Sequence, residues 1–411
     1  MTYFIHEQVV LLRPPEGPVA AHLVSFANFV GEQGYRAFSL RRHVRIAAGF
    51  SRWLGQRGIQ VQSICSAHAV EYLRDRARHL RPGRGDTAAL QHLITFLRGE
   101  GVIPKEKVEP ARLTAVEHCV QDYAQYLCEA RGLATATIIN YVPFVRDFLK
   151  HQFGEGPATL PRLGAGDVVG FVQHRVPRLH LKRAKLMTTA LRSFLRYARY
   201  RGDITLDLAA AVPVVANWSM TSIPRAIGAD QVRQLLDSID RDQPTGRRDY
   251  AILLLLARMG LRSGEVAFLE LDDIDWNAGQ MHVGGKGGQR YELPLPVEVG
   301  EAIAVYLQFG RPRSASRRVF LRARAPSRGF QGASGVCSLV RHSLERAGIN
   351  TPTRGAHQFR HGLASEMLRQ GASLGEIGEL LGHRHPQTTT IYTKVDITAL
   401  RTLALPWPGG V

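Results

Sequence analysis

Residues 355–393 read GAHQFRHGLASEMLRQGASLGEIGELLGHRHPQTTTIYT, and this stretch decides how the rest of the chain is interpreted. Its pattern predicts helices with breaks at Gly371 and Gly382, because glycine weakens a helix interior and suits a helix end. The stretch carries four side chains that can handle protons or phosphate oxygens, namely His357, Arg360, His383 and Tyr392. Each is weak evidence alone, but their order and spacing together indicate an active site built on helices.

The region before this stretch predicts the remainder of the same domain. Tyr250–Arg258 is a strongly apolar helix, and Gly260 after it suits the left-handed C-terminal cap. Met281–Leu295 predicts two short strands around the glycine-rich turn Gly284–Gly288. Further helices are expected at Asp230–Leu236, Glu301–Phe309 and Val336–Ala347. We therefore expect residues 225–405 to form a mainly α domain with a small β-hairpin or sheet, which is the α+β class.

The short motifs of this domain follow one another as in a known family. They are Gly260-Leu-Arg262-Ser-Gly-Glu265, Gly285-Lys286-Gly287, His357-Gln-Phe-Arg360-His361, Leu380-Leu-Gly-His383 and Tyr392. The set resembles the catalytic domain of the tyrosine recombinases, the phage-integrase family. In that family the tyrosine follows the Leu-Gly-His histidine by nine residues, and here 392 − 383 = 9. The resemblance implies six catalytic residues: Arg262, Lys286, His357, Arg360, His383 and Tyr392.

The chemistry of these side chains suits cleavage of a DNA phosphodiester. Tyr392 can supply the nucleophile, although its reference pKa of about 10 calls for a positive surround or a neighbouring base. Arg262 and Arg360 suit the two non-bridging oxygens, because a planar guanidinium makes bidentate contacts. His357, one helical turn before Arg360, can accept the tyrosine proton or donate to a phosphate oxygen. His383 can donate to a non-bridging oxygen.

The remaining groups of the set have supporting roles. Lys286 lies on a glycine-flanked turn that can reach into a groove and protonate the 5′ leaving oxygen. Glu265 is expected to be a buried orienting carboxylate rather than a catalytic acid. A phosphotyrosine link conserves the energy of the phosphodiester, so no ATP is required. Because cationic side chains can stabilise the transition state in place of an ion, we expect neither a metal nor another cofactor.

Three rival functions remain open at this point. His357 with His361, and His383 with His385, have spacings that can bind zinc, as in a metal-dependent nuclease. No Asp or Glu with an obvious spacing completes that site, and Arg360 would repel the ion, so His361 and His385 are expected to be structural or to face a phosphate. A catalytically inactive DNA-binding accessory subunit would lack a Tyr or an Arg, and none is missing. A type IB topoisomerase shares the phosphotyrosine chemistry, but the nine-residue spacing favours a recombinase.

The composition is that of a folded and strongly basic protein. The 411 residues include 53 Lys and Arg against 35 Asp and Glu, a net charge of +18, and 45% are hydrophobic. A chain this basic suits a polyanion. The longest aliphatic run, Ala251–Ala257, is far shorter than the about 20 residues that a bilayer requires, so no membrane span is expected. The N-terminus does not read as a signal peptide, and the four cysteines show no CxxC spacing, so we expect reduced thiols in a cytoplasmic protein.

The positive charge is concentrated in stretches without acids. Val168–Gly202 contains nine basic residues and Ala302–Leu344 contains eight arginines, and neither has an Asp or Glu. Random composition bias would scatter acids among the bases, so these stretches favour phosphate-binding surfaces. The closing helix of the first stretch is expected to point Arg192, Arg196 and Arg199 outward. The DNA-binding candidates are Arg175, Arg178, Lys182, Arg183, Lys185, Arg192, Arg196 and Arg199.

The first half of the chain contains a diverged repeat at an offset of 97 to 101 residues. Phe26–Val30 resembles Tyr123–Leu127, and later matches stay in order. Both copies read as helical, and Thr137 is expected to be the N-cap of a helix in the second copy. The family resemblance implies that the second copy is a helical, SAM-like core-binding domain, and that the first is an additional one of the kind seen in transposon-borne members. The expected domains are 15–106, 112–205, a linker at 206–224, and the catalytic domain at 225–405.

The resemblance also implies a function and its partners. The chain is expected to be a site-specific recombinase that cuts and rejoins DNA through a 3′-phosphotyrosyl intermediate, for integration, excision or transposition of a mobile element. Its partner would be double-stranded DNA. Four protomers, either copies of this chain or sister recombinases, would assemble on two sites and exchange strands in pairs.

Overall fold

The computed structural model describes residues 3–6, 9–11, 13–81, 83, 85–105, 113–154, 156–215, 225–285, 290–351, 353–383 and 385–395. The chain divides into two compact units, Lys107–Thr221 and the combination of Met1–Glu106 with Ser222–Val411. Within these residues, the buried apolar side chains form four clusters, each confined to one stretch of the sequence. None of the described helices is both long and apolar enough to cross a membrane.

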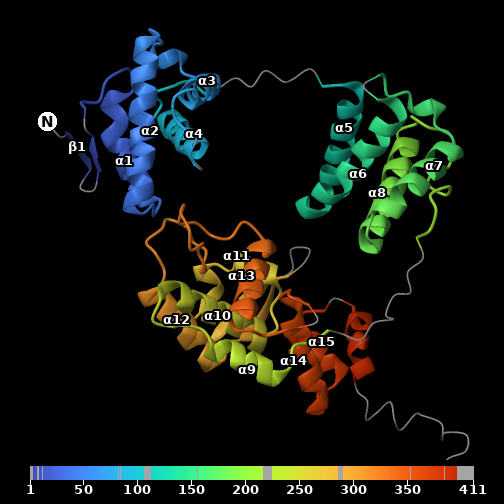
Figure 1. The fold of residues 1–411 in the computed structure, drawn as a ribbon. Helices are drawn as coiled ribbons and strands as arrows, with labels where there is room; N and C mark the ends of the chain where they lie inside the picture. The colour runs from blue at the N-terminus through green and yellow to red at the C-terminus, as the bar shows by residue number, and fades with distance from the viewer. Residues whose placement is uncertain are drawn as a thin grey trace, which may run out of the picture. The chain divides into compact units, whose positions relative to one another are not determined.

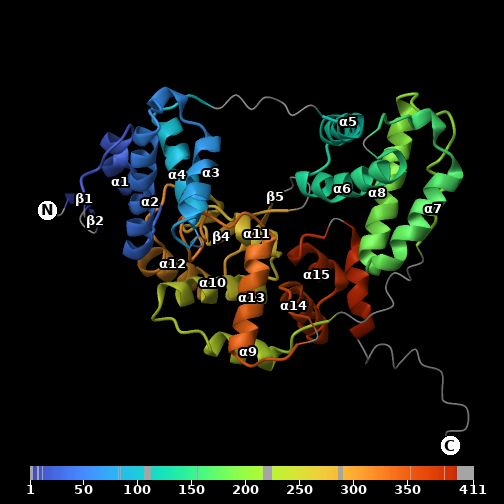
Figure 2. The same ribbon diagram turned by 45° about the horizontal axis from the view of Figure 1, so that its top comes forward.

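The first stretch is a four-helix bundle with its own core (Figures 1 and 2). Its elements are the hairpin β1 (Tyr3–His6) and β2 (Val9–Leu11), η1 (Ala20–His22), α1 (Leu23–Glu32), α2 (Ala37–Gln56), η2 (Val61–Ser63), α3 (Ser66–Ala77) and α4 (Asp86–Gly99). The long helix α2 buries Leu40, Val44, Ala47 and Leu54, a spacing of three, four and seven residues that places them on one face. The hairpin was not predicted from the sequence.

The second stretch repeats this arrangement around a separate core. Its elements are α5 (Ala115–Glu129), α6 (Thr135–Phe153), η3 (Leu160–Arg162), α7 (Ala165–Arg175), η4 (Val176–Arg178) and α8 (Leu181–Tyr200). The short helix η3 follows η2 by 160 − 61 = 99 residues, and α7 follows α3 by 165 − 66 = 99. The order and offset of the elements agree with a duplication.

Two boundaries differ from the prediction. Helix α6 begins at Thr135 with Ala134 as its N-cap, so Thr137 lies inside the helix instead of capping it. Leu208, Ala209 and Val212 are buried in the second core, so the first part of the expected linker 206–224 belongs to this domain. Residues 216–224 lie outside the described part of the chain.

The third stretch is mainly helical with a three-stranded antiparallel sheet. Its helices are α9 (Ala229–Asp237), α10 (Pro244–Arg258), α11 (Ser263–Phe268), η5 (Leu271–Asp273), α12 (Val297–Phe309), α13 (Ala333–Arg346), α14 (His357–Arg369), α15 (Leu374–Leu380) and η6 (Pro386–Val395). Strands β3 (Ile274–Asp275), β4 (Gln280–Gly284) and β5 (Arg290–Pro294) are neighbours in that order. Met281 pairs with Leu293 and Val283 with Tyr291, which confirms the predicted hairpin.

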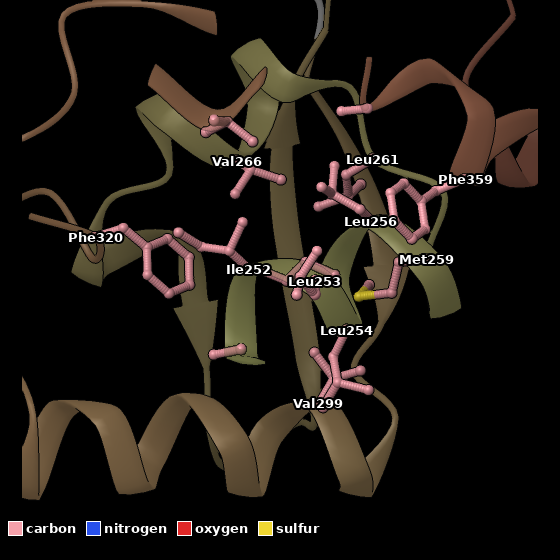
Figure 3. Packing of buried hydrophobic residues seen from close by; sticks show 14 of the residues in the cluster. Ile252, Leu253, Leu254, Leu256, Met259, Leu261, Val266, Val299, Phe320 and Phe359 are labelled. Atoms are coloured by element: carbon pink, nitrogen blue, oxygen red, sulfur yellow. The ribbon is translucent and has the colours of Figure 1, made fainter. Parts of the chain in front are cut away.

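Helix α10 is the centre of this domain. Every residue from Ala251 to Leu256 is buried, as expected of a helix that is apolar on all sides. Figure 3 shows its side chains packed against Val299, Phe320 and Phe359 from other elements. The helix ends at Arg258, and Gly260 has a φ of 61°, which confirms the predicted left-handed cap. The chain then turns directly into the candidate active site.

Candidate active site

Arg262 is held at the start of α11 by a buried carboxylate. Glu265, 7% exposed, accepts a hydrogen bond from the Arg262 backbone N–H at 2.7 Å and another from its Nη1 at 2.6 Å. The capping position explains the geometry, because a carboxylate three residues into a helix satisfies an unpaired N–H of the first turn. Glu265 therefore fixes both the backbone and the guanidinium of Arg262, which is an orienting contact.

Arg360 is buried without a carboxylate beside it. It is 3% exposed, and its guanidinium donates to the Gly260 carbonyl at 2.8 Å and to the Leu381 carbonyl. Among the described residues, no Asp or Glu oxygen lies within 4 Å of this side chain. A buried cation whose partners are only carbonyl dipoles retains a full positive charge in a place where charge is costly. Such an arrangement is suited to an anionic ligand.

Gly260 brings the two arginines together. A Cβ at this position would lie 2.8 Å from Leu381 Cδ2 and 3.0 Å from Leu363 Cδ2. Only a glycine therefore lets the end of α10 approach α14 and the turn after α15 this closely. The same close approach presents the Gly260 carbonyl to Arg360, two residues before Arg262.

His383 follows α15, and its ring is held by a threonine. Its Nδ1 lies 2.8 Å from the hydroxyl of Thr389, which is 1% exposed. Burial, and then Arg360 and Arg262, lower the pKa of His383 to about 4, so the ring is neutral near pH 7. In the tautomer in which Thr389 donates to Nδ1, the ring proton is on Nε2 and is available to a phosphate oxygen.

Tyr392 lies in η6 and is 2% exposed. It packs in a small cluster with Ala364, Ile377 and Leu381. Its hydroxyl lies 3.1 Å from Nδ1 of His361. Burial raises the pKa of Tyr392, and Arg360 and Arg262 oppose that rise. The phenol is therefore protonated at neutral pH.

The electrostatic potential at the site is positive, which favours the binding of an anion. Loss of solvent, and then Arg360 and Arg262, lower the pKa of His357, and loss of solvent together with His357 and Arg360 lowers that of His361. Among the described residues the site contains two guanidinium groups and one carboxylate, that of Glu265, which contacts Arg262, so a net positive charge is left. All the shifts caused by the arginines have the sign expected for a positive potential.

The structure brings together five of the six predicted catalytic residues. Arg262 is the N-cap of α11, His357 and Arg360 lie in the first turn of α14, and His383 and Tyr392 follow α15. Lys286 lies outside the described residues. Gly285 and Arg290, which flank that segment, line the same hollow as Arg262 and His357. The two ends of the hairpin turn thus lie at the site.

Sequence reasoning missed two contacts of the site, those of His361 and Thr389. The sequence offered one signal for each: His361 is one turn after His357, and Thr389 lies in the threonine run before the tyrosine. Neither signal shows which atom a side chain will face. Among the described residues, no three His, Cys, Asp or Glu side chains are grouped so that they could hold a metal ion.

Two other tyrosines of the domain have structural surroundings. The Tyr306 hydroxyl is deep in the core and accepts the Leu321 backbone N–H at 3.2 Å. The Tyr291 ring packs on the turn at Gly382, where a Cβ would lie 3.0 Å from it. Burial and the neighbouring Glu265 carboxylate raise the pKa of Tyr291. Tyr291 therefore couples strand β5 to the turn that carries His383.

The basic residues of the second helical stretch fall into two groups. At the start of α8 and just before it, four cations have no acidic partner among the described residues: Arg178, Lys182, Arg183 and Lys185. Arg183 additionally lies over the Phe144 ring, 4.7 Å from its centre. The first turn of α8 has no acid, so positive side chains and the positive end of the helix dipole coincide. Repulsion between these cations and the helix dipole lowers the stability of the folded state. The same charges favour the binding of an anion.

The other predicted cations of this stretch have internal partners, with one exception. Arg175 pairs with Asp147, and Arg199 pairs with Asp207 at 3.1 Å. Arg192 is only half-exposed and donates to the carbonyls of Val212 and Pro213 at 2.9 and 3.0 Å, so the prediction that it points outward is wrong. The reason is that residues 208–212 pack back onto α8. Arg196 is exposed, and no carboxylate of the described residues lies within 4 Å of it.

Comparison with known proteins agrees with this geometry. A profile of the "Phage integrase family" matches residues 225–398, and one described as "Phage integrase, N-terminal SAM-like domain" matches residues 120–202. The protein y4rA of Sinorhizobium fredii, named as an integrase/recombinase, is 62% identical over 409 residues, which is 100% of this chain and 99% of that protein.

Two further proteins extend the comparison. Tyrosine recombinase XerD of Mycobacterium tuberculosis is 33% identical over 309 residues, which cover 71% of this chain and 96% of XerD. A structure of the XerH site-specific recombinase, a post-cleavage complex with its palindromic difH substrate, has a TM-score of 0.58 at 17% identity. That match covers 74% of this chain and 99% of the XerH chain, and it shows that the fold is shared.

Proposed function

The chain belongs to the phage integrase family of tyrosine recombinases, and from this premise we propose that it cuts and rejoins DNA through a covalent bond between Tyr392 and a 3′ phosphate. Site-specific recombination is the function of the family. The proposal assigns that function to particular atoms of this chain. Its proposed substrate is double-stranded DNA, and its proposed location is the cytoplasm.

One observation carries the assignment. Arg360 is 3% exposed and, among the described residues, donates only to the carbonyls of Gly260 and Leu381. It adjoins Arg262, which Glu265 already holds. A net positive charge in a buried site near a tyrosine hydroxyl is stabilised when a phosphate binds. No other described tyrosine combines such a charge with a hydrogen-bonded, protonated phenol.

The proposed reaction gives each of these groups a role. The Tyr392 oxygen forms a bond to phosphorus, the bond to the 5′ oxygen breaks, and the leaving oxygen gains a proton. Arg262 and Arg360 bind the non-bridging oxygens, and neutral His383 donates to one of them through Nε2. His357, next to Arg360 on α14, donates to the phosphate. Lys286 supplies the proton to the leaving oxygen.

The start of α8 is proposed as the main phosphate-binding surface outside the active site. Arg178, Lys182, Arg183 and Lys185 support this, because none of the four has an acidic partner in the described part of the chain and they lie where the helix dipole already attracts an anion. Arg196 is a further contact on the same helix. Arg175, Arg192 and Arg199 bind DNA only if they release the partners described above.

The assembly is proposed to be a tetramer, formed by copies of this chain or with sister recombinases. A palindromic target, such as the substrate in the XerH complex, has two equivalent half-sites, and two-fold symmetry then requires two protomers on each site. Exchange between two sites requires four. The biological purpose that we propose is integration, excision or transposition of a mobile element.

The direct test is to trap the covalent intermediate. A duplex that the full chain selects from a random pool is nicked next to the cleavage position, so that the released strand end diffuses away. We expect a protein–DNA adduct whose digestion yields a phosphopeptide containing Tyr392, and none from Tyr392→Phe. An adduct that survives in Tyr392→Phe would disprove the assignment. We also expect cleavage to persist in excess EDTA, and a loss restored by zinc or magnesium would favour the nuclease alternative.

The role of Lys286 needs a separate experiment. Lys286→Ala should bind DNA almost normally and cleave it slowly, because the leaving oxygen lacks its proton donor. A substrate with sulfur in place of the 5′ bridging oxygen leaves without protonation and should restore the rate of the variant. Equal defects on both substrates would assign Lys286 another role.

A further inference from the structure

The contact between His361 and Tyr392 has no place in the roles described so far. His361 lies one turn after His357 on α14, and its Nδ1 is 3.1 Å from the Tyr392 hydroxyl. The two rings meet with centres 5.7 Å apart at an angle of 61°. Among the described residues, the Tyr392 hydroxyl has no other hydrogen-bond partner. The atom that must attack phosphorus is thus held by one imidazole.

We propose that His361 positions the Tyr392 phenol and accepts its proton when the oxygen attacks phosphorus. This inference rests on the proposed function and adds to it a residue that acts on the nucleophile itself. It also gives the two histidines of α14 separate roles. His361 contacts the nucleophile, and His357 contacts the phosphate.

The surroundings of His361 keep it in the form that can accept a proton. The groups that face it are His357 and Arg360 on its own helix, His383 after α15 and Tyr392 in η6. Burial, followed by the charges of His357 and Arg360, lowers its pKa, so the ring is neutral at pH 7. Burial keeps the phenol protonated, so the phenol needs a base at the moment of attack.

Each proton has a donor and an acceptor, both in cleavage and in rejoining. In cleavage, the Tyr392 oxygen–phosphorus bond forms, the bond from phosphorus to the 5′ oxygen breaks, and the phenol proton moves to Nδ1 of His361. The leaving oxygen takes its proton from the general acid. In rejoining, a 5′ hydroxyl attacks phosphorus, the tyrosine oxygen leaves, and His361 returns the proton to it. The incoming phosphate offsets the positive charge that His361 carries in between.

The test measures single-turnover cleavage of the nicked duplex by the full chain. His361→Asn preserves a polar group near the Nδ1 position but cannot accept a proton at neutral pH. We expect DNA binding within about twofold of the unaltered chain and a cleavage rate lower by about 10²- to 10⁴-fold. The rate of the unaltered chain should fall toward acid pH as His361 becomes protonated, and His361→Asn should lose that part of the profile. The matched control is His342→Asn, at an exposed histidine of α13, which should cleave normally.

Chemical rescue distinguishes a base from a structural residue. In His361→Ala, added imidazole should restore part of the cleavage rate, with the restored rate rising as the fraction of neutral imidazole rises. Normal cleavage by His361→Asn would overturn the proposal. So would faster cleavage by His361→Ala, since the contact would then restrain the tyrosine instead of activating it.

Two further comparisons separate the possible failures. If Tyr392→Phe still forms the adduct, the proposed function fails; if it forms none while His361→Asn cleaves normally, only this inference fails. Should the His361 variants not fold, the contact can be measured in Tyr392→Phe, which loses only one hydroxyl. The ¹⁵N resonance of His361 should shift in Tyr392→Phe and that of His342 should not. An unchanged His361 resonance would overturn the proposal.

Discussion

Two glycines in the catalytic domain have the same backbone conformation but different surroundings. Gly260 follows α10 with a φ of 61°, and Gly348 follows α13 with a φ of 66°. A Cβ at Gly348 meets nothing within 4 Å, whereas one at Gly260 lies 2.8 Å from Leu381. Alanine at either site bears the left-handed strain of about 1–2 kcal/mol. Gly260→Ala should add an overpacking cost of about 1–3 kcal/mol.

Denaturant unfolding of both variants tests this expectation. Gly260→Ala should also cleave DNA more slowly than Gly348→Ala, because its carbonyl holds Arg360. Equal free energies of unfolding for the two variants would mean that Leu363 and Leu381 move aside without cost. Equal cleavage rates would show that the position of the Gly260 carbonyl does not control Arg360.

The Thr389 hydroxyl offers a second prediction about a single atom. Thr389→Val conserves the shape of a side chain that is 1% exposed, but it removes the partner of His383 Nδ1. Loss of one such hydrogen bond is worth about 1 kcal/mol, so cleavage should fall by about five- to tenfold. Thr389→Ser should cleave normally. Thr390→Val is the matched control, because its hydroxyl bonds the Gln387 carbonyl away from His383.

At this scale the sequence predicted residue types better than contacts. The spacing of His357, Arg360, His383 and Tyr392 in the sequence was enough to predict that they lie near one another. Short helices and turns connect them, so few other arrangements are open to the chain. The contact of His361 with the tyrosine could not be predicted, since it depends on how α14 and η6 rotate against each other. The partners of Arg360 could not be predicted either, because they are backbone carbonyls, which every residue type has.

The cations of helix α8 are expected to have different roles in DNA binding and in stability. Replacing Lys182, Arg183 and Lys185 by alanine should flatten the log–log salt dependence of DNA affinity by two to three units, at about 0.9 per phosphate. Lys182→Ala alone should raise the melting temperature at low salt, because it removes a cation from the positive end of the helix dipole.

Arg192→Ala is the matched control for this prediction. It should lower the melting temperature and leave the salt slope nearly unchanged, because Arg192 holds the carbonyls of Val212 and Pro213. A flatter slope in Arg192→Ala than in the triple variant would show that this residue leaves its internal partners to bind DNA.

Helices were predicted well at their apolar centres and less well at their ends. The C-terminal ends of α10 and α12 were predicted to the residue, because apolar runs end there and a glycine follows soon after. The N-cap of α6 was missed by three residues: Thr137 suits an N-cap, but Ala134 takes that position, after a loop in which the Leu133 backbone N–H donates to the Leu127 carbonyl near the end of α5. The side chain that suits a cap therefore did not decide that boundary.

The whole molecule contains two helical bundles of similar order whose charges are used differently. In the first bundle many arginines are neutralised by its own acids: Arg42 and Arg76 lie 2.6 and 3.9 Å from Asp86, and Arg57 and Arg78 lie 2.6 and 3.6 Å from Asp75. In the second bundle, the cations at the start of α8 have no acidic partner among the residues that the structure describes. Most of the non-specific affinity for DNA should therefore come from the second bundle.

Deletion of residues 1–104 tests this division. The first bundle has its own core, and XerD aligns over 96% of its length with only 71% of this chain, so shorter members exist in this family. The shortened chain should still form the Tyr392 adduct on the nicked duplex. Its salt slope should flatten less than that of the α8 triple variant, while its footprint on DNA shortens or tetramer assembly fails. If the deletion flattens the slope more, the arginines of the first bundle exchange their internal carboxylates for phosphates, and the roles of the two bundles are the reverse of those proposed.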